Sequence, residues 1–168
     1  MNKIKIGING FGRIGRQVLK TINSNFKDSL EVVAINDLGD IRTSAHLLKY
    51  DSTHGRLQEK LEINDHGINI SGRYIKFFRE KSPENINWDK EGVQIVIEST
   101  GIFTDGNLAS SHLGGSVKKV VISAPAKNED ITIVLGVNHK DYDPKKHNII
   151  SNASCTTNCV APMVKVLN

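Results

Sequence analysis

Predicted strands and helices alternate along most of this chain, and this alternation limits the possible folds more than any other feature. Residues 3–9 carry Ile at every second position, which is typical of a strand. Residues 13–26 follow as a predicted helix whose apolar residues lie four apart, at Ile14, Val18, Ile22 and Phe26. The same rhythm predicts strands at 31–36, 94–98, 119–124, 131–136 and 148–151, and helices at 41–50 (capped by Asp40) and 108–113. Such a sequence predicts an α/β fold with a doubly wound, mostly parallel sheet.

One segment departs from this rhythm. Residues 57–78 predict two or three antiparallel strands, with turns at 64–67 and 71–72. The length of 168 residues and the apolar share of 38% suit one globular domain and exclude a disordered or disulfide-dense chain. We therefore expect an antiparallel insertion in the parallel sheet, and a ligand at the carboxyl ends of the parallel strands.

The glycine-rich turn after the first predicted strand indicates a dinucleotide site. Residues 10–15, GFGRIG, have the spacing GxGxxG and open the predicted helix, which is the context found in Rossmann-like folds. We expect Gly10 to make the tight turn, Gly12 to let the backbone approach a pyrophosphate, and Gly15 to let helix and strand pack closely. A glycine turn that binds some other ligand is the alternative interpretation.

An acidic residue supports the dinucleotide interpretation. Asp37 ends the second predicted strand, about twenty residues beyond the glycine turn, where a carboxylate accepts hydrogen bonds from ribose hydroxyls. Leu38 and Gly39 follow it, so no Arg stands ready for a 2′-phosphate. The sequence therefore favours NAD over NADP as the cofactor.

Two cysteines lie at the start of a helix that Val160, Val164 and Leu167 predict from residue 155 onward. One helical turn holds the Cβ atoms of Cys155 and Cys159 about 5–6 Å apart, which is too far for a disulfide. Two thiols are also too few for a structural zinc site, so no metal is expected. The positive end of the helix dipole stabilises a thiolate at Cys155, and nearby N–H groups can form an oxyanion hole.

We therefore expect Cys155 to be a nucleophile and Cys159 a small packed residue. A buried structural role for Cys155 is the alternative. A thiolate beside a nicotinamide suits the oxidation of an aldehyde through a covalent thioester, because the thiol adduct of the aldehyde can give up a hydride.

Five blocks of sequence resemble the glyceraldehyde-3-phosphate dehydrogenase family. They are INGFGRIGR (8–16), HLLKYDS (46–52), ESTG (98–101), SAPAKNED (123–130) and ASCTTNC (153–159). The resemblance implies a cytoplasmic, homotetrameric, NAD-dependent glycolytic enzyme that oxidises and phosphorylates glyceraldehyde 3-phosphate to 1,3-bisphosphoglycerate. It also implies an NAD-binding domain over residues 1–152, and the first helix of a catalytic domain over residues 153–168.

The resemblance assigns site residues as well. It makes Cys155 the nucleophile and places Ser154 and Thr156 beside the substrate. It gives contacts with NAD to Asn9, Gly10, Phe11, Gly12, Arg13, Ile14, Asp37, Lys81, Thr100, Gly101 and Ser123. The stretch around Ser99, Thr100 and Gly101, together with Ser123, should form walls of the cofactor cleft, with Phe103 near the nicotinamide. Lys81 stands where the family usually has Arg, and a backbone contact would survive that change whereas a stacked or bidentate contact would not.

Other features of the family are expected outside this sequence. The family's catalytic His and its phosphate-binding residues belong to the second domain, and none of His46, His54, His66, His112, His139 and His147 is expected to act as the base. The last predicted helix is still running at Asn168, so the chain looks cut there, and we expect residues 1–168 alone to be inactive.

Three alternatives stay open. One is erythrose-4-phosphate dehydrogenase, which shares the cysteine motif but tends to carry Glu at the position of Asp37. Another is a free-standing NAD-binding module. The third is a nucleic-acid or surface role, suggested only by the net charge of +4. Because the charges are scattered and no apolar run is long enough to span a bilayer, we expect neither nucleic acid nor membrane as a partner.

Overall fold

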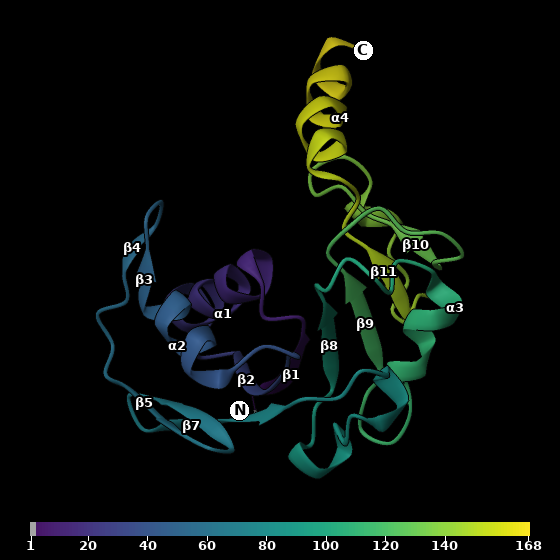
Figure 1. The fold of residues 1–168 in the computed structure, drawn as a ribbon. Coiled ribbons are helices and arrows are strands. Elements are labelled where there is room, and N and C mark those ends of the chain that lie inside the picture. Colours follow the sequence, from purple (N-terminus) through teal and green to yellow (C-terminus); the bar gives the residue numbers. More distant parts are fainter. Residues whose placement is uncertain (1–2) are drawn as a thin grey trace.

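Nine strands of the described part of the chain, residues 3–168, form one sheet in this computed structural model (Figure 1). Their order across the sheet is β10-β11-β9-β8-β1-β2-β7-β6-β5. Their bounds are β1 Ile4–Asn9, β2 Leu30–Asn36, β5 Leu61–Asn64, β6 Gly67–Ile70, β7 Arg73–Phe78, β8 Ile95–Glu98, β9 Lys119–Ile122, β10 Ile131–Thr132 and β11 Ile149–Ser151. Neighbours from β10 to β7 pair in parallel, whereas β6 pairs antiparallel with both β5 and β7. The predicted Rossmann-like parallel sheet with an antiparallel insertion is confirmed.

Four α-helices and four 3₁₀ turns complete residues 3–168, together with a short hairpin that the sequence reading missed. The hairpin strands have two residues each, which is too short to show a periodic pattern. The bounds are α1 Arg13–Asn25, α2 Ile41–Lys49, α3 Gly106–Ala109, α4 Cys155–Leu167, η1 Pro83–Asn85, η2 Asp89–Glu91, η3 Ser110–His112, η4 His139–Asp141, β3 Tyr50–Asp51 and β4 Gly55–Arg56. Figure 1 shows α1 and α2 on one side of the sheet and α3 beyond β9.

Adjacent residues of one strand supply two separate cores. Ile35 of β2 packs in a cluster with Leu19 of α1 and Leu48 of α2, whereas Ala34 belongs to a cluster that contains Trp88 and Val120. Successive side chains of a strand point to opposite faces, so each face of the sheet has its own apolar cover. Burial on both faces is what a parallel sheet requires.

The face of α1 that meets the core differs from the prediction. Gly15, Leu19 and Ile22 are buried, whereas Ile14 and Phe26 are 51% and 49% exposed. A step of four residues turns a helix by about 400°, so a row of residues spaced by four drifts about 40° at each step. The ends of the predicted row have therefore rotated out of the core.

Helix capping explains where two other helices begin. The carboxylate of Asp40 accepts a hydrogen bond from the backbone N–H of Thr43 at 3.0 Å, which confirms the predicted cap of α2. Asp105 does the same for Asn107 at 2.8 Å. That cap starts α3 at Gly106, before the predicted start at 108, and the rest of the predicted helix is the 3₁₀ turn η3.

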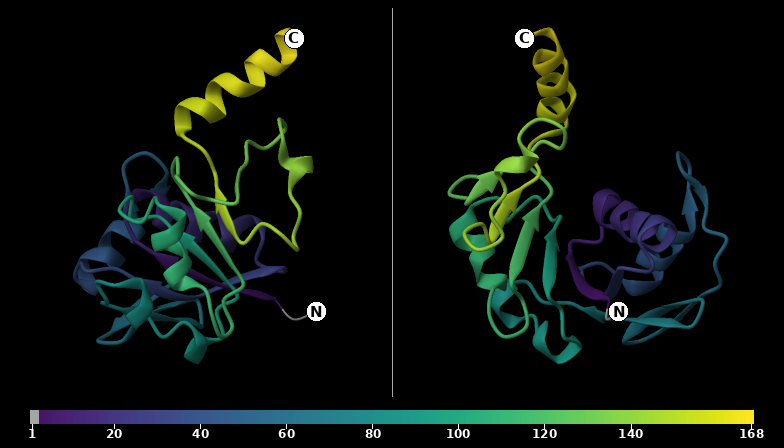
Figure 2. Two further views of the ribbon diagram at one scale, coloured as in Figure 1. Left: turned by 90° about the vertical axis from the view of Figure 1, so that its right-hand side faces the viewer. Right: turned by 180° about the vertical axis from the view of Figure 1, so that it is seen from behind.

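Helix α4 projects away from the sheet, as both views in Figure 2 show. None of its residues is buried, and Val166 and Leu167 are 85% and 87% exposed. Cys159 is also exposed, because within residues 3–168 no element covers its side of the helix, and its packing stays a prediction. No helix in this described range is long and apolar enough to cross a membrane.

Candidate functional site

A cavity of about 260 Å³ opens where β1, β2 and β8 end. Its lining combines residues from three strand ends and from the loop after β7. The lining residues are Asn9, Gly10, Gly12, Asn36, Asp37, Leu38, Lys81, Ser99, Thr100, Ile102 and Phe103. The structure thus brings together six of the predicted cofactor residues, namely Asn9, Gly10, Gly12, Asp37, Lys81 and Thr100.

The three glycines of the turn differ in what surrounds them. Gly10 has a φ of +89°, and a Cβ there would lie 2.6 Å from the backbone nitrogen of Thr100. A Cβ on Gly15 would overlap the carbonyl oxygen of Gly10. Gly12 has no heavy atom within 4 Å of its would-be Cβ, so the space in front of it is open. Gly10 and Gly15 therefore serve close packing, while Gly12 leaves room for a ligand.

The amino end of α1 is suited to an anion. Gly12 is its N-cap, no side chain caps it, and the first helical bond runs from the N–H of Arg16 to the carbonyl oxygen of Gly12. The N–H groups of Arg13 and Ile14 precede that bond, so they have no acceptor within the helix. Free N–H groups and the positive end of the dipole favour a phosphate at this point.

Asp37 connects the second strand to the glycine turn. Its Oδ2 accepts from the N–H of Phe11 at 2.6 Å, and its Oδ1 accepts from the N–H of Gly39 at 2.7 Å. A carboxylate has about four acceptor positions, so two stay available for the hydroxyls of a ribose. Phe11 itself is buried, with 2% of its surface exposed, and contributes through its backbone and not as a wall of the cavity.

Sequence reasoning left three lining residues out. Leu38 and Ile102 are 60% and 71% exposed, and they give the cavity apolar side chains that suit the face of an aromatic ring. Asn36 is the last residue of β2. Each of the three directly adjoins a predicted site residue, so proximity in sequence was the signal that could have found them.

The remaining predicted cofactor residues lie beside the cavity without lining it. Arg13 and Ile14 are exposed at the start of α1, and Gly101 follows β8 with a φ of +74°. Ser123 follows β9, and its N–H donates to the carbonyl oxygen of Glu98 at 2.9 Å. All of them occupy the edge where the parallel strands end.

The cysteine turn begins at the carboxyl end of β11, next to β9 on that same edge. Cys155 is the first residue of α4 and is exposed, so a buried structural role for it is wrong. The Oγ of Ser154 accepts from the N–H of Thr157 at 2.8 Å and caps the helix. The amide of Asn158 donates to the carbonyl oxygens of Asn152 and Ser154 at 2.8 and 2.9 Å.

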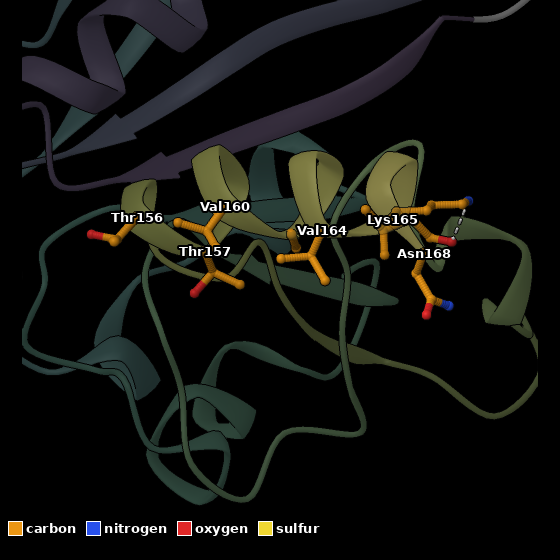
Figure 3. A pocket seen from close by; sticks show the side chains of 8 residues that line it. Thr156, Thr157, Val160, Val164, Lys165 and Asn168 are labelled. Atoms are coloured by element: carbon orange, nitrogen blue, oxygen red, sulfur yellow. Dashed lines mark hydrogen bonds between the residues drawn. The ribbon is translucent and has the colours of Figure 1, made fainter.

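None of the three predicted substrate residues lines the cofactor cavity. Thr156 instead borders a separate hollow along α4, which Figure 3 shows with Val160 and Val164 on the same side of the helix. Lys165 holds that side of α4 against the loop between β10 and η4, because its Nζ donates to the carbonyl oxygens of Gly136 and Val137.

The fold and the cavity define a nucleotide-binding domain of the Rossmann type. The open space at Gly12, the uncapped N–H groups of α1 and the carboxylate of Asp37 fit the pyrophosphate and ribose of a dinucleotide. Among residues 3–168 there is no group of three or more His, Cys, Asp or Glu side chains that could hold a metal ion.

Comparison with known proteins then places the chain in a family. Residues 4–106 match the family model described as glyceraldehyde 3-phosphate dehydrogenase, NAD binding domain. The chain belongs to this family, and NAD is its cofactor.

Curated relatives agree with this placement. The chain is 57% identical to glyceraldehyde-3-phosphate dehydrogenase 1 of Bacillus cereus over 164 residues, which are 98% of this chain and 48% of the relative. It is 57% identical to the dehydrogenase of Geobacillus stearothermophilus and 58% identical to dehydrogenase 2 of Streptomyces avermitilis, each over 165 residues, 98% of this chain and 49% of the relative. The chain therefore spans about half the length of these relatives.

Proposed function

We propose that this chain is the NAD-binding and nucleophile-bearing part of a phosphorylating glyceraldehyde-3-phosphate dehydrogenase. The observation that carries the proposal is the position of an exposed, N-terminal helical cysteine on the sheet edge that holds the dinucleotide cavity. Residues 1–152 would form the cofactor domain, and residues 153–168 would begin the catalytic domain.

The cofactor contacts follow from the cavity. The N–H groups of Arg13 and Ile14 would bind the pyrophosphate, and Asp37 would accept from the ribose hydroxyls. Leu38 and Ile102 would enclose the adenine between apolar side chains. The charge of Asp37 would repel a 2′-phosphate, which supports NAD over NADP.

The reaction would start at Cys155. Its thiolate adds to the aldehyde carbon of glyceraldehyde 3-phosphate, and the carbonyl oxygen takes the negative charge of the thiohemiacetal. The N–H groups of Cys155 and Thr156 precede the first helical bonds of α4, so they are available to stabilise that oxygen. Bound NAD supplies the acceptor for the hydride that leaves this adduct.

The oxidised adduct is a thioester of Cys155. Inorganic phosphate attacks its carbonyl carbon, the carbon–sulfur bond breaks, and the thiolate returns as 1,3-bisphosphoglycerate forms. We expect the general base to be a histidine outside residues 1–168, together with the groups that hold the substrate phosphate. A homotetramer in the cytoplasm, with neither nucleic acid nor membrane as a partner, is part of the same proposal.

Steady-state kinetics of the full-length natural protein test this function. Formation of NADH should require glyceraldehyde 3-phosphate and phosphate, and Cys155→Ser should lower kcat by about 10⁴-fold or more while leaving the Kd for NAD unchanged. A chain ending at residue 168 should not turn over. A higher kcat/KM for erythrose 4-phosphate, or full activity of Cys155→Ser, would overturn the proposal.

A further inference from the structure

A line of buried polar side chains runs from Trp88 to the floor of the cavity, and the proposed reaction does not use it. Glu98, His112, Asn9 and Asn36 are at most 4% exposed. Burying polar groups is unfavourable unless hydrogen bonds satisfy them, so a network of this size at a binding site calls for a functional explanation.

The proton positions at one end of the network are fixed by Trp88. Its Nε1–H donates to Nδ1 of His112 at 3.0 Å. An indole nitrogen can only donate, so Nδ1 carries no proton and Nε2 does. The Nε2–H of His112 then donates to Oε2 of Glu98 at 3.0 Å.

The other end is fixed by the backbone of Glu80. Its N–H donates to Oδ1 of Asn36 at 2.8 Å, and its carbonyl oxygen accepts from Nδ2 of Asn36 at 2.9 Å. The same Nδ2 donates to Oδ1 of Asn9 at 2.8 Å. The amide nitrogen of Asn9 is therefore directed at Oε2 of Glu98, to which it donates at 2.6 Å.

All four neighbours of the Glu98 carboxylate consequently donate to it. Asn9 and His112 donate to Oε2, while the N–H and the hydroxyl of Thr100 donate to Oε1. These four hydrogen bonds fill the acceptor positions of the Glu98 carboxylate. A side chain with N–H groups in place of this carboxylate would therefore face a donor on every side.

Three members of the network belong to the three strand ends that build the cavity, whereas His112 lies in the 3₁₀ turn η3. Asn9 ends β1, Asn36 ends β2, and Thr100 follows the end of β8. All three line the cavity, and each is joined to Glu98 directly or through one amide. β2 and β8 lie on opposite sides of β1, so Glu98 links strand ends that do not pair with one another.

We propose that Glu98 is a positioning residue for NAD: with His112 as an aligned hydrogen-bond donor, it sets the spacing of the three strand ends that receive the dinucleotide. This inference rests on the proposed role of the cavity in binding NAD. It assigns no chemical step to either residue, and it predicts that the network governs affinity for the cofactor.

Glu98→Gln is the sharpest test because the side chain keeps its shape. Either orientation of the new amide points N–H groups at donors, so we expect the Kd for NAD to rise about tenfold in calorimetric titration of the full-length protein. Glu62→Gln makes the same change at a side chain that is 59% exposed, and it should leave the Kd unchanged. Ile68→Val, at a fully buried position of β6, should lower the Tm without changing the Kd.

His112 provides a second pair of variants. His112→Gln keeps an N–H that can reach Glu98 and should retain most of the affinity for NAD, whereas His112→Leu removes it and should weaken binding about as much as Glu98→Gln. In the cofactor-free wild type, NMR at neutral pH should show the Nε2–H tautomer of His112. Amide exchange of Thr100 should be faster in Glu98→Gln.

The outcomes separate this inference from the proposed function. Equal effects of Glu98→Gln and Ile68→Val on the Kd would show a merely structural role and overturn it, as would an Nδ1–H tautomer of His112. If the wild type binds NAD and Glu98→Gln binds it with the same Kd, this inference alone is overturned. A wild type that does not bind NAD would overturn both.

Discussion

The cofactor cavity and the cysteine turn share one edge of the sheet but are held in different ways. The cavity depends on side chains that bond groups distant in sequence: Asp37 holds the backbone of Phe11, and Glu98 holds Asn9. The cysteine turn depends on Ser154 and Asn158, whose bonds stay within six residues. A change in the cavity should therefore propagate through the sheet, whereas a change in the cysteine turn should stay local.

The largest expected effect comes from Gly10→Ala. The new Cβ would lie 2.6 Å from the backbone nitrogen of Thr100 at a φ of +89°. Strain and overlap together should lower the free energy of unfolding by about 3 kcal/mol, measured by urea denaturation.

Two glycine variants serve as controls for this prediction. Gly55→Ala has a similar φ of +79° but open space, so it should cost only about 1 kcal/mol. Gly12→Ala meets nothing within 4 Å and should change stability little, yet it should weaken NAD binding by filling the open space. Equal destabilisation by Gly10→Ala and Gly55→Ala would contradict the close approach.

The next largest effect is expected for Asp37→Asn. The amide cannot accept from both Phe11 and Gly39, and it loses the charge that opposes a 2′-phosphate. We expect the Kd for NAD to rise about tenfold to thirtyfold, and the preference for NAD over NADP to shrink. Titrations with both cofactors measure these Kd values. An unchanged ratio of the Kd for NAD to the Kd for NADP would show that Asp37 does not contact the ribose.

A smaller effect is expected in the cysteine turn. Ser154→Ala removes the cap of α4 and should cost about 1 kcal/mol of local helix stability, seen as faster amide exchange within α4. The Kd for NAD should stay unchanged, because the cap bonds nothing in the cavity. Ser24→Ala, near the end of α1, is the matched control. A higher Kd for NAD, or global unfolding, in Ser154→Ala would contradict the local character of the turn.

The smallest effect concerns Asp51. Like Asp37, its carboxylate accepts from two backbone N–H groups, but it does not line the cofactor cavity. The backbone N–H groups of His54 and Thr53 hold the pKa of the Asp51 carboxyl well below its usual range. A lowered pKa in the folded state adds stability that is present above the unfolded pKa of about 3.9 and is lost as the pH falls below it. Wild type should therefore be more stable than Asp51→Asn at neutral pH, and the difference in Tm should shrink below about pH 4. A difference that is independent of pH would exclude the carboxylate as its source.

Local patterns explain what could be predicted from the sequence. The GxGxxG turn, Asp37 and the Asp40 cap of α2 depend on residues within one turn or strand end, so spacing alone locates them. The Glu98–His112 network could not be predicted that way, because its members are up to 103 residues apart and meet only after the sheet forms. The exposure of Cys159 could not be predicted from the sequence either, because a helical pattern does not indicate what packs against the helix.

The pair of hydrogen bonds that the amide of Asn158 donates to the carbonyl oxygens of Asn152 and Ser154 has a consequence for how such a protein can diverge. It fastens the first turn of α4 to the end of β11, so the thiol inherits its position from the nucleotide-binding sheet. Whatever packs against the remaining turns of the helix can then change in shape or sequence without displacing the sulfur. The sheet determines the position of the Cys155 sulfur, so residues around this nucleophile can change to form new substrate pockets.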